Sequence, residues 1–197
     1  IPASTVPYEE IVIDFIGPLT KTRNGKRFVL MIVDSATKTL EAIPMRTMAA
    51  KNVAENLLIF FTRVGIPKII RSDNGKSFTA KIVRVMEDKL GIAPRFSSIY
   101  HPQSQGITER ANDTIKRMMN KFMEEFNNQW NKFLPFLIFA HNDAENATLG
   151  FSPHQLLYGR TLRGFGDILK STWTTDLDEE NILKPGSLLQ YYDTLRD

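Results

Sequence analysis

The sequence predicts an α/β domain in which a mixed sheet is flanked by helices. Three observations favour this class: β-branched and aliphatic segments gather near the start, strands then alternate with helical periods, and helical spacing dominates the remainder. The chain has 197 residues, of which 42% are hydrophobic and 24% are charged, which is enough for one domain with a sizeable core.

The first apolar segments are predicted to be strands. Residues 11–17 and 27–45 are rich in β-branched and aliphatic side chains, and the Asn24-Gly25 pair between them is a strong turn signal. We therefore expect a strand, a turn and then a pair of strands.

Strands and helices alternate from residue 48 onwards. Residues 48–65 carry apolar side chains at helical spacing and stop at a Gly-Ile-Pro sequence, which predicts a helix. A short buried strand is expected at 68–73, a second helix at 79–91 and another short strand at 93–98.

The rest of the chain is predicted to be mainly helical. A polar loop broken by proline and glycine covers 98–106, and one apolar face of a long helix covers 107–125. A further helix over 130–144 is expected to be interrupted or kinked near Pro135, and a short helix follows with Pro153 in its first turn.

These elements divide the chain into two parts. Residues 1–163 form the predicted domain, and residues 164–197 are interpreted as a linker or the start of a following C-terminal element. The first part carries 22 Lys and Arg against 15 Asp and Glu, and the second carries 3 against 7. A basic body favours a polyanionic partner.

Composition excludes several classes of site. The chain has no cysteine, so it forms no disulfide and no thiolate zinc site, and His101, His141 and His154 are too far apart in sequence for a zinc-binding pattern. No apolar run reaches the roughly 20 residues that a membrane span needs. We therefore expect a protein without a membrane partner.

Three carboxylates are candidates for catalysis. Asp14 interrupts an apolar strand, where a buried charge needs compensation, and Asp73 ends the apolar segment KIIRSD. Glu109 opens the long helix on its polar face. For Glu109 alone, a solvent-facing acid favoured by the helix dipole is the alternative interpretation.

The motifs around these acids resemble one family. Asp14 in IDFIGPL, Asp73 in SDNGKSFTA and Glu109 in YHPQSQGITERAN, with 35 residues between the last two, are similar to the D,D,35,E triad of retroviral and LTR-retrotransposon integrases. The segment GFSPHQLLYGR resembles one that follows the catalytic core in gypsy-type and several retroviral members, and the gypsy-type branch is the one we expect.

The resemblance implies a fold and a chemistry. The fold is RNase H-like, a five-stranded mixed sheet flanked by helices. Asp14, Asp73 and Glu109 would be the catalytic residues and would hold two Mg²⁺ or Mn²⁺ ions per active site when DNA is bound, because hard oxygen ligands suit hard cations. The implied enzyme is an integrase, a polynucleotidyl transferase with nuclease activity that trims the 3′ ends of element DNA and joins them to target DNA.

The resemblance also implies partners. Tyr100, Gln105, Asn112 and Lys116 occupy positions that contact element DNA in the family, although a surface role is the alternative for each. The chain would act on retroelement DNA ends and target DNA as at least a homodimer, in the nucleus of the host cell after a stage in a virus-like particle or the cytoplasm. A chromatin tether is compatible with this role. The family's zinc-binding N-terminal domain has no counterpart here, so we expect a piece of a longer protein.

Other functions are kept as alternatives. The first is a domesticated integrase-like protein that binds DNA or a protein partner without catalysis. The second is a nuclease of the same fold that cleaves RNA in hybrids, and the third is a helical interaction module, which leaves Asp14 unexplained. Asp34, a second strand acid, is interpreted as hydrogen-bonded structure or as part of the substrate neighbourhood rather than as a metal ligand.

Overall fold

The computed structural model describes residues 5–72, 90–96, 117, 120–121, 127–146 and 149–164. Residues 1–160 form one compact unit, to which all the helices and strands named here belong. Most of three predicted segments, the helices at 79–91 and 107–125 and the tail at 164–197, lies outside the described residues, as does the whole of the loop at 98–106. The domain boundary after residue 163 stays a prediction.

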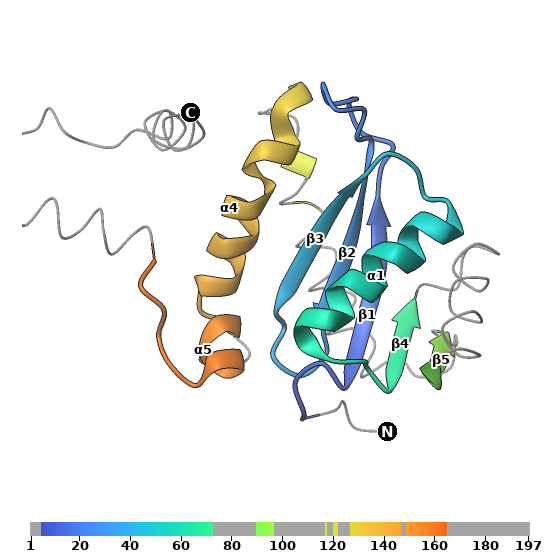
Figure 1. Ribbon diagram of the computed structural model, residues 1–197. Coiled ribbons are helices and arrows are strands. Elements are labelled where there is room, and N and C mark those ends of the chain that lie inside the picture. The colour runs from blue at the N-terminus through green and yellow to red at the C-terminus, as the bar shows by residue number, and fades with distance from the viewer. Residues whose placement is uncertain are drawn as a thin grey trace, which may run out of the picture. The chain divides into compact units, whose positions relative to one another are not determined.

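The described strands form one mixed sheet in the order β3-β2-β1-β4-β5 (Figure 1). β1 pairs antiparallel with β2, and β2 pairs antiparallel with β3, whereas β4 runs parallel to both β1 and β5. The α/β class with a mixed sheet is therefore as predicted. The strands are Glu10–Ile16 (β1), Phe28–Asp34 (β2), Leu40–Met45 (β3), Ile69–Ser72 (β4) and Ala93–Phe96 (β5).

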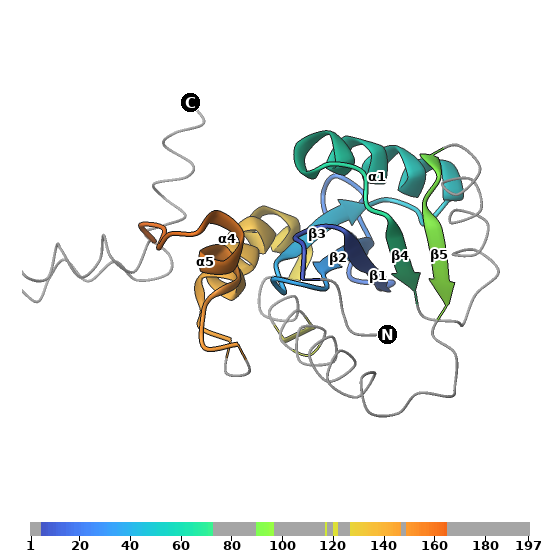
Figure 2. The same cartoon turned by 90° about the horizontal axis from the view of Figure 1, so that it is seen from below.

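Alternating side chains bury both faces of the sheet. One face packs against α1, residues Ala50–Val64, through the buried Val53, Leu57, Phe60 and Phe61. The opposite face packs against α4, residues Trp130–Asp143, which lies beside β3 (Figure 2). Because neighbouring strand residues point to opposite faces, β1 and β2 contribute to both cores.

α4 is attached at both ends. A short 3₁₀ helix, η1 (Asn127–Gln129), leads into it, and the fully buried Trp130 donates from Nε1 to the carbonyl of Thr20 at 2.9 Å. The helix runs through Pro135 without interruption, so the predicted interruption is wrong, and the alternative of a kink stays a prediction. Burial of Trp130 and Leu134 on the preceding turn holds the segment in place although the proline removes one backbone hydrogen bond.

A short helix follows α4, as the sequence predicts. α5 covers Pro153–Tyr158, and Ser152 caps it with a capping box shared with Gln155. Proline in the first turn is compatible because the first amides of a helix have no partner within it. None of the helices in the described part of the chain is long and apolar enough to cross a membrane.

Two glycines shape the connection between β1 and β2. Gly25 takes a φ of +76° in the predicted turn and donates its N–H to the carbonyl of Thr22. Gly17, directly after β1, has a φ of +129°, and a Cβ there would lie 2.7 Å from the carbonyl oxygen of Arg27. Only glycine therefore fits where the chain leaves β1.

Candidate active site

Asp14 lies in the second half of β1 and is half-buried. Alternation along the strand puts it on the same face as Val12 and Ile16, which pack toward α4. Its Oδ1 accepts the N–H of Phe15 at 2.7 Å, and this local bond orients the carboxylate. This face of β1 therefore carries two acids, Glu10 at the start of the strand and Asp14 between the apolar Val12 and Ile16.

The pairing of β1 with β4 determines what lies beside Asp14. The two strands are parallel, and the last paired row joins Ile13 to Ser72. The carboxyl ends of parallel strands lie toward the same edge of a sheet, so β1 and β4 both point their carboxyl ends to one side. Asp14 is the residue after Ile13, and Asp73 is the residue after Ser72.

The other predicted site residues cannot be placed. Asp73, Glu109, Tyr100, Gln105, Asn112 and Lys116 all lie outside the described residues. Within the described ranges, no group of three or more His, Cys, Asp and Glu side chains could hold a metal ion. The triad and the DNA contacts therefore stay predictions, with Asp14 the one member whose surroundings are known.

Asp34, at the end of β2, is hydrogen-bonded within the fold, the first of the two roles expected for it. It is fully buried, and its Oδ1 accepts the N–H of Tyr8 at 2.9 Å. Its Oδ2 accepts both the N–H and the hydroxyl of Thr37, at 2.9 and 2.6 Å. The two bonds from Thr37 close the turn between β2 and β3, and the bond from Tyr8 ties that turn to the segment before β1.

Comparison with known proteins identifies the family. Residues 4–102, about half of the chain, match the family described as integrase core domain. The chain belongs to the integrase core domain family. It is 35% identical over 153 residues to the Pro-Pol polyprotein of Simian foamy virus type 3 (strain LK3). That match covers 78% of this chain and 13% of the polyprotein, so the chain spans a small part of this relative.

Solved structures share the fold. The catalytic core domain of BIV integrase superposes with a TM-score of 0.58 at 23% identity, over 77% of this chain and 95% of that chain. A chain of the simian T-cell lymphotropic virus intasome, solved with PP2A regulatory subunit B56 gamma, gives a TM-score of 0.64 at 20% identity, over 83% of this chain and 59% of that chain. The predicted resemblance to retroviral and retrotransposon integrase cores is confirmed, and the gypsy-type branch stays a prediction.

A second acid is buried at the start of β1 in this integrase core. Glu10 is 2% exposed, and its Oε1 lies 2.6 Å from Nε of Arg71 on β4. The same oxygen accepts the hydroxyl of Ser35 at 3.2 Å. Sequence reasoning missed this ion pair because the two residues are 61 positions apart and only the strand register brings them together.

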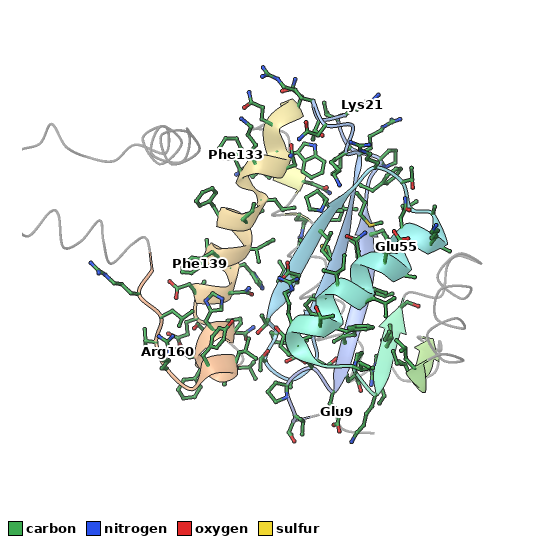
Figure 3. The ribbon with its side chains drawn as sticks, in the orientation of Figure 1. Glu9, Lys21, Glu55, Phe133, Phe139 and Arg160 are labelled. Carbon is green, nitrogen blue, oxygen red and sulfur yellow. The ribbon has the colours of Figure 1, made fainter. Side chains whose placement is uncertain are left out.

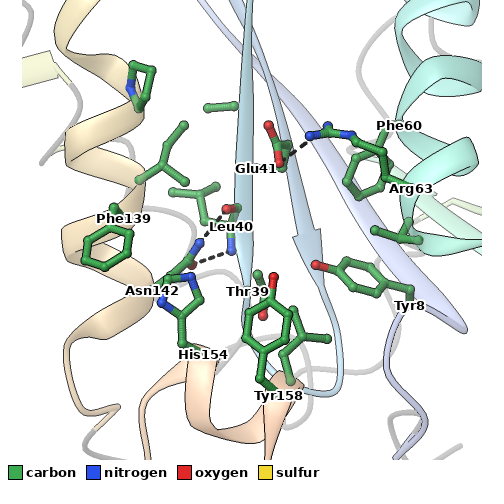
Figure 4. Close-up of a pocket in the computed structure, with 15 residues that line it drawn as sticks. Tyr8, Thr39, Leu40, Glu41, Phe60, Arg63, Phe139, Asn142, His154 and Tyr158 are labelled. Carbon is green, nitrogen blue, oxygen red and sulfur yellow. Dashed lines mark hydrogen bonds and ion pairs between the residues drawn. The ribbon is translucent and has the colours of Figure 1, made fainter. Parts of the chain in front are cut away.

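The integrase core also has a pocket of about 410 Å³ above the edge strand β3, which the sequence did not indicate (Figure 4). On its floor the side-chain amide of Asn142 bonds both backbone groups of Leu40, accepting at 2.8 Å and donating at 2.9 Å. Tyr8 also lines the pocket. Burial raises the pKa of its hydroxyl, and the nearby Asp34 and Tyr158 raise it further. Arg63 of α1 lines the pocket as well, and its Nη2 lies 3.5 Å from Oε2 of Glu41.

Proposed function

We propose that this chain is the catalytic core of a retroelement integrase, a metal-dependent polynucleotidyl transferase with nuclease activity. It would trim the 3′ ends of element DNA and join them to target DNA. The observation that carries the proposal is the row of Ile13 and Ser72 across β1 and β4. In the sequence Asp14 directly follows Ile13 and Asp73 directly follows Ser72, and these are the two acids predicted from the strands.

The donor set suits a hard divalent cation. Asp14, Asp73 and Glu109 offer only carboxylate oxygens, the ligands that Mg²⁺ and Mn²⁺ prefer. When bound, two such ions would activate the attacking oxygen and stabilise the leaving oxygen of a phosphoryl displacement. The amide of Phe15 holds the carboxylate of Asp14 in one orientation, which reduces the entropy lost on binding a cation.

The α4 face of β1 supports this role for Asp14. An acid between Val12 and Ile16 sits beside a packed apolar core, where electrostatic interactions are stronger than in water. A carboxylate in such surroundings is costly unless a cation or hydrogen bonds compensate it. A divalent ion would supply that compensation.

The partners follow from the same proposal. Tyr100, Gln105, Asn112 and Lys116 would contact element DNA, and the excess of basic residues in 1–163 would favour the phosphate backbone. We propose a homo-oligomer that brings two DNA ends to one target, working in the nucleus after a stage in a virus-like particle or the cytoplasm. Membership of the gypsy-type branch belongs to this proposal too.

A disintegration assay tests the proposal. The whole chain is given a branched DNA oligonucleotide with Mn²⁺, and reversal of strand transfer is measured for the unaltered chain and for Asp14→Asn, Asp73→Asn and Glu109→Gln. Each variant should lose activity by a factor of about 100 or more, because each removes a charged metal ligand. Glu55→Gln is the control, since Glu55 is an exposed acid on α1 and should leave the rate unchanged.

Two results would contradict the proposal. Activity in Asp14→Asn equal to that of the unaltered chain would remove Asp14 from the site. Absence of activity in every protein, together with DNA binding by the folded chain, would favour the domesticated binding protein.

A further inference from the structure

We propose that the buried ion pair of Glu10 and Arg71 is a register lock that positions the end of β4 beside Asp14. The inference rests on the proposed function, because it gives Arg71 a role in assembling the metal site. Glu10 and Arg71 would be positioning residues, which act through the strands and touch neither metal nor DNA.

The contact between β1 and β4 is short. Only four rows pair the two strands, from Glu10 with Ile69 to Ile13 with Ser72. The backbone ladder alone would be equally satisfied by a shifted register, since parallel strands repeat their bonding pattern every two residues. Side chains must therefore select the observed register.

Apolar alternation excludes a shift by one residue. Ile11 and Ile70 face each other on the α1 side and are both almost fully buried. A slip of one residue would turn Ile70 away from that core and put Arg71 into it. A slip of two residues keeps every side chain on its face, so the apolar pattern does not oppose it.

The ion pair opposes the two-residue shift that would carry Arg71 away from Glu10. Arg71 lies opposite Val12, on the same face as Glu10, so the two charged side chains meet diagonally across the strands. Moving β4 by two residues, about 7 Å, so that Arg71 lies opposite Asp14 would separate them and leave the buried Glu10 without its cation. A shift in the other direction would place Ser72 instead of Ile70 opposite the buried Ile11. With the arginine in place the glutamate side chain is 3% exposed, so the pair holds this carboxylate away from water.

Glu10 is itself held by β2. Its Oε1 accepts the hydroxyl of Ser35, and its backbone carbonyl accepts the N–H of the same serine at 2.9 Å. The carboxylate thus has a fixed position before Arg71 binds to it. Arg71 in turn is two residues before Asp73, so the lock acts on the segment that leads directly to that acid.

A second ion pair between the same strands provides a matched control. Lys68, just before β4, places its Nζ 2.6 Å from Oε1 of Glu9, the same separation as in the buried pair. The lysine side chain is 77% exposed, so water can solvate either partner when the other is removed. Lys68→Gln should therefore change neither stability nor register.

The test compares stability with metal affinity. Glu10→Met and Arg71→Met are combined in one variant, so that an apolar pair of similar volume replaces the ion pair and no unpaired charge remains. The thermal midpoint without metal and the Mn²⁺ dissociation constant, from the electron paramagnetic resonance signal of free Mn²⁺, are measured on the whole chain. We expect an unchanged or higher midpoint and Mn²⁺ binding weaker by about tenfold.

Single variants keep the test decisive if the double variant does not fold. Arg71→Lys retains the cation and should bind Mn²⁺ within about threefold of the unaltered chain, whereas Arg71→Gln should bind about tenfold more weakly. A purely structural role predicts that stability and affinity fall together. Unchanged affinity in the folded double variant, or equal affinities of Arg71→Lys and Arg71→Gln, would overturn the inference.

Mn²⁺ binding by Asp14→Asn distinguishes failure of the register-lock inference from failure of the proposed function. If Asp14→Asn abolishes Mn²⁺ binding and the double variant binds normally, the metal site exists and the register lock is wrong. If Asp14→Asn binds Mn²⁺ as the unaltered chain does, the proposed function itself fails.

Discussion

The two ends of the central strands each carry an acid, and the two acids differ in burial and in hydrogen bonding. Asp34, where β2 ends beside the start of β1, is fully buried and accepts three hydrogen bonds from Tyr8 and Thr37. Asp14, nearer the other end of β1, is half-buried, and its described bond comes from the adjacent amide of Phe15. Glu9 and Lys21 mark these two ends of the sheet in Figure 3.

The difference teaches how a strand acid can be assigned. A fully buried carboxylate that accepts three hydrogen bonds from amides and a hydroxyl already has the compensation that burial requires. A half-buried carboxylate such as Asp14 is still partly exposed to solvent, from which a cation can reach it. We therefore expect loss of Asp34 to affect folding and loss of Asp14 to affect chemistry.

Replacing Asp34 and Asp14 separately by asparagine should give the largest difference between the two ends of the sheet. Asp34→Asn should lower the free energy of unfolding by about 3 kcal/mol, because an amide nitrogen cannot accept the two bonds from Thr37. Asp14→Asn should change it by less than about 1 kcal/mol while abolishing disintegration. Urea denaturation of both variants measures the effect, and equal destabilisation would break the comparison.

The next largest effect on the free energy of unfolding is expected at the edge strand β3, which pairs with β2. Asn142→Ala should cost about 2 to 3 kcal/mol, because it leaves the buried N–H and C=O of Leu40 without the bonds that Asn142 supplies. Asp143→Asn, one residue further along α4, is the control and should cost less than about 0.5 kcal/mol. Denaturation of both variants checks this, and similar values for the two would show that the edge needs no such cap.

At the Asp14 end, Gly17 gives a smaller effect. Gly17→Ala should cost about 2 kcal/mol, because it adds a Cβ at a φ of +129° that would lie 2.8 Å from the ring of Phe28. Gly159→Ala is the matched control, since its φ is +66° but nothing lies within 4 Å of the added atom. It should cost about 1 kcal/mol. Thermal unfolding distinguishes these outcomes, and a larger loss for Gly159 would be inconsistent with the steric argument.

The smallest effect is a pH dependence near the Asp34 end. Burial lowers the pKa of His141 below its ordinary value of 6.5, although a backbone bond to Lys38 opposes the shift. Below about pH 6.5 the unfolded chain therefore binds more protons than the folded chain, and stability falls as the pH falls. His141→Gln should reduce the loss of unfolding free energy between about pH 7.5 and 5.5. An identical loss in both proteins would exclude His141 as the cause.

Much of the fold could be predicted because its signals are local. β1 was expected at 11–17 and covers Glu10–Ile16, and α1 was expected at 48–65 and covers Ala50–Val64. Apolar alternation and helical spacing act within one element, so a sequence reports them directly. Pro135 does not interrupt α4, because burial of the neighbouring turn outweighs the missing bond.

The candidate site could be predicted only in part. Asp14 and Asp34 look alike in sequence, each an acid within or at the end of an apolar strand, and the distinguishing bonds depend on the turn that Thr37 closes. The pairing of Asn142 with Leu40, 102 residues apart, and that of Glu10 with Arg71 have no local pattern at all. They follow from register and helix docking, which become visible only once the sheet is assembled.

Paramagnetic broadening by Mn²⁺ tests the central claim most directly. Amide signals of Phe15 and Met31, which lie beside Asp14 on β1 and β2, are compared with those of Tyr8 and Thr37, which bind Asp34. We predict that substoichiometric Mn²⁺ broadens the first pair selectively and that Asp14→Asn removes the effect. Broadening of the Asp34 pair instead, or broadening at Phe15 that survives Asp14→Asn, would contradict the assignment of Asp14 to the metal site.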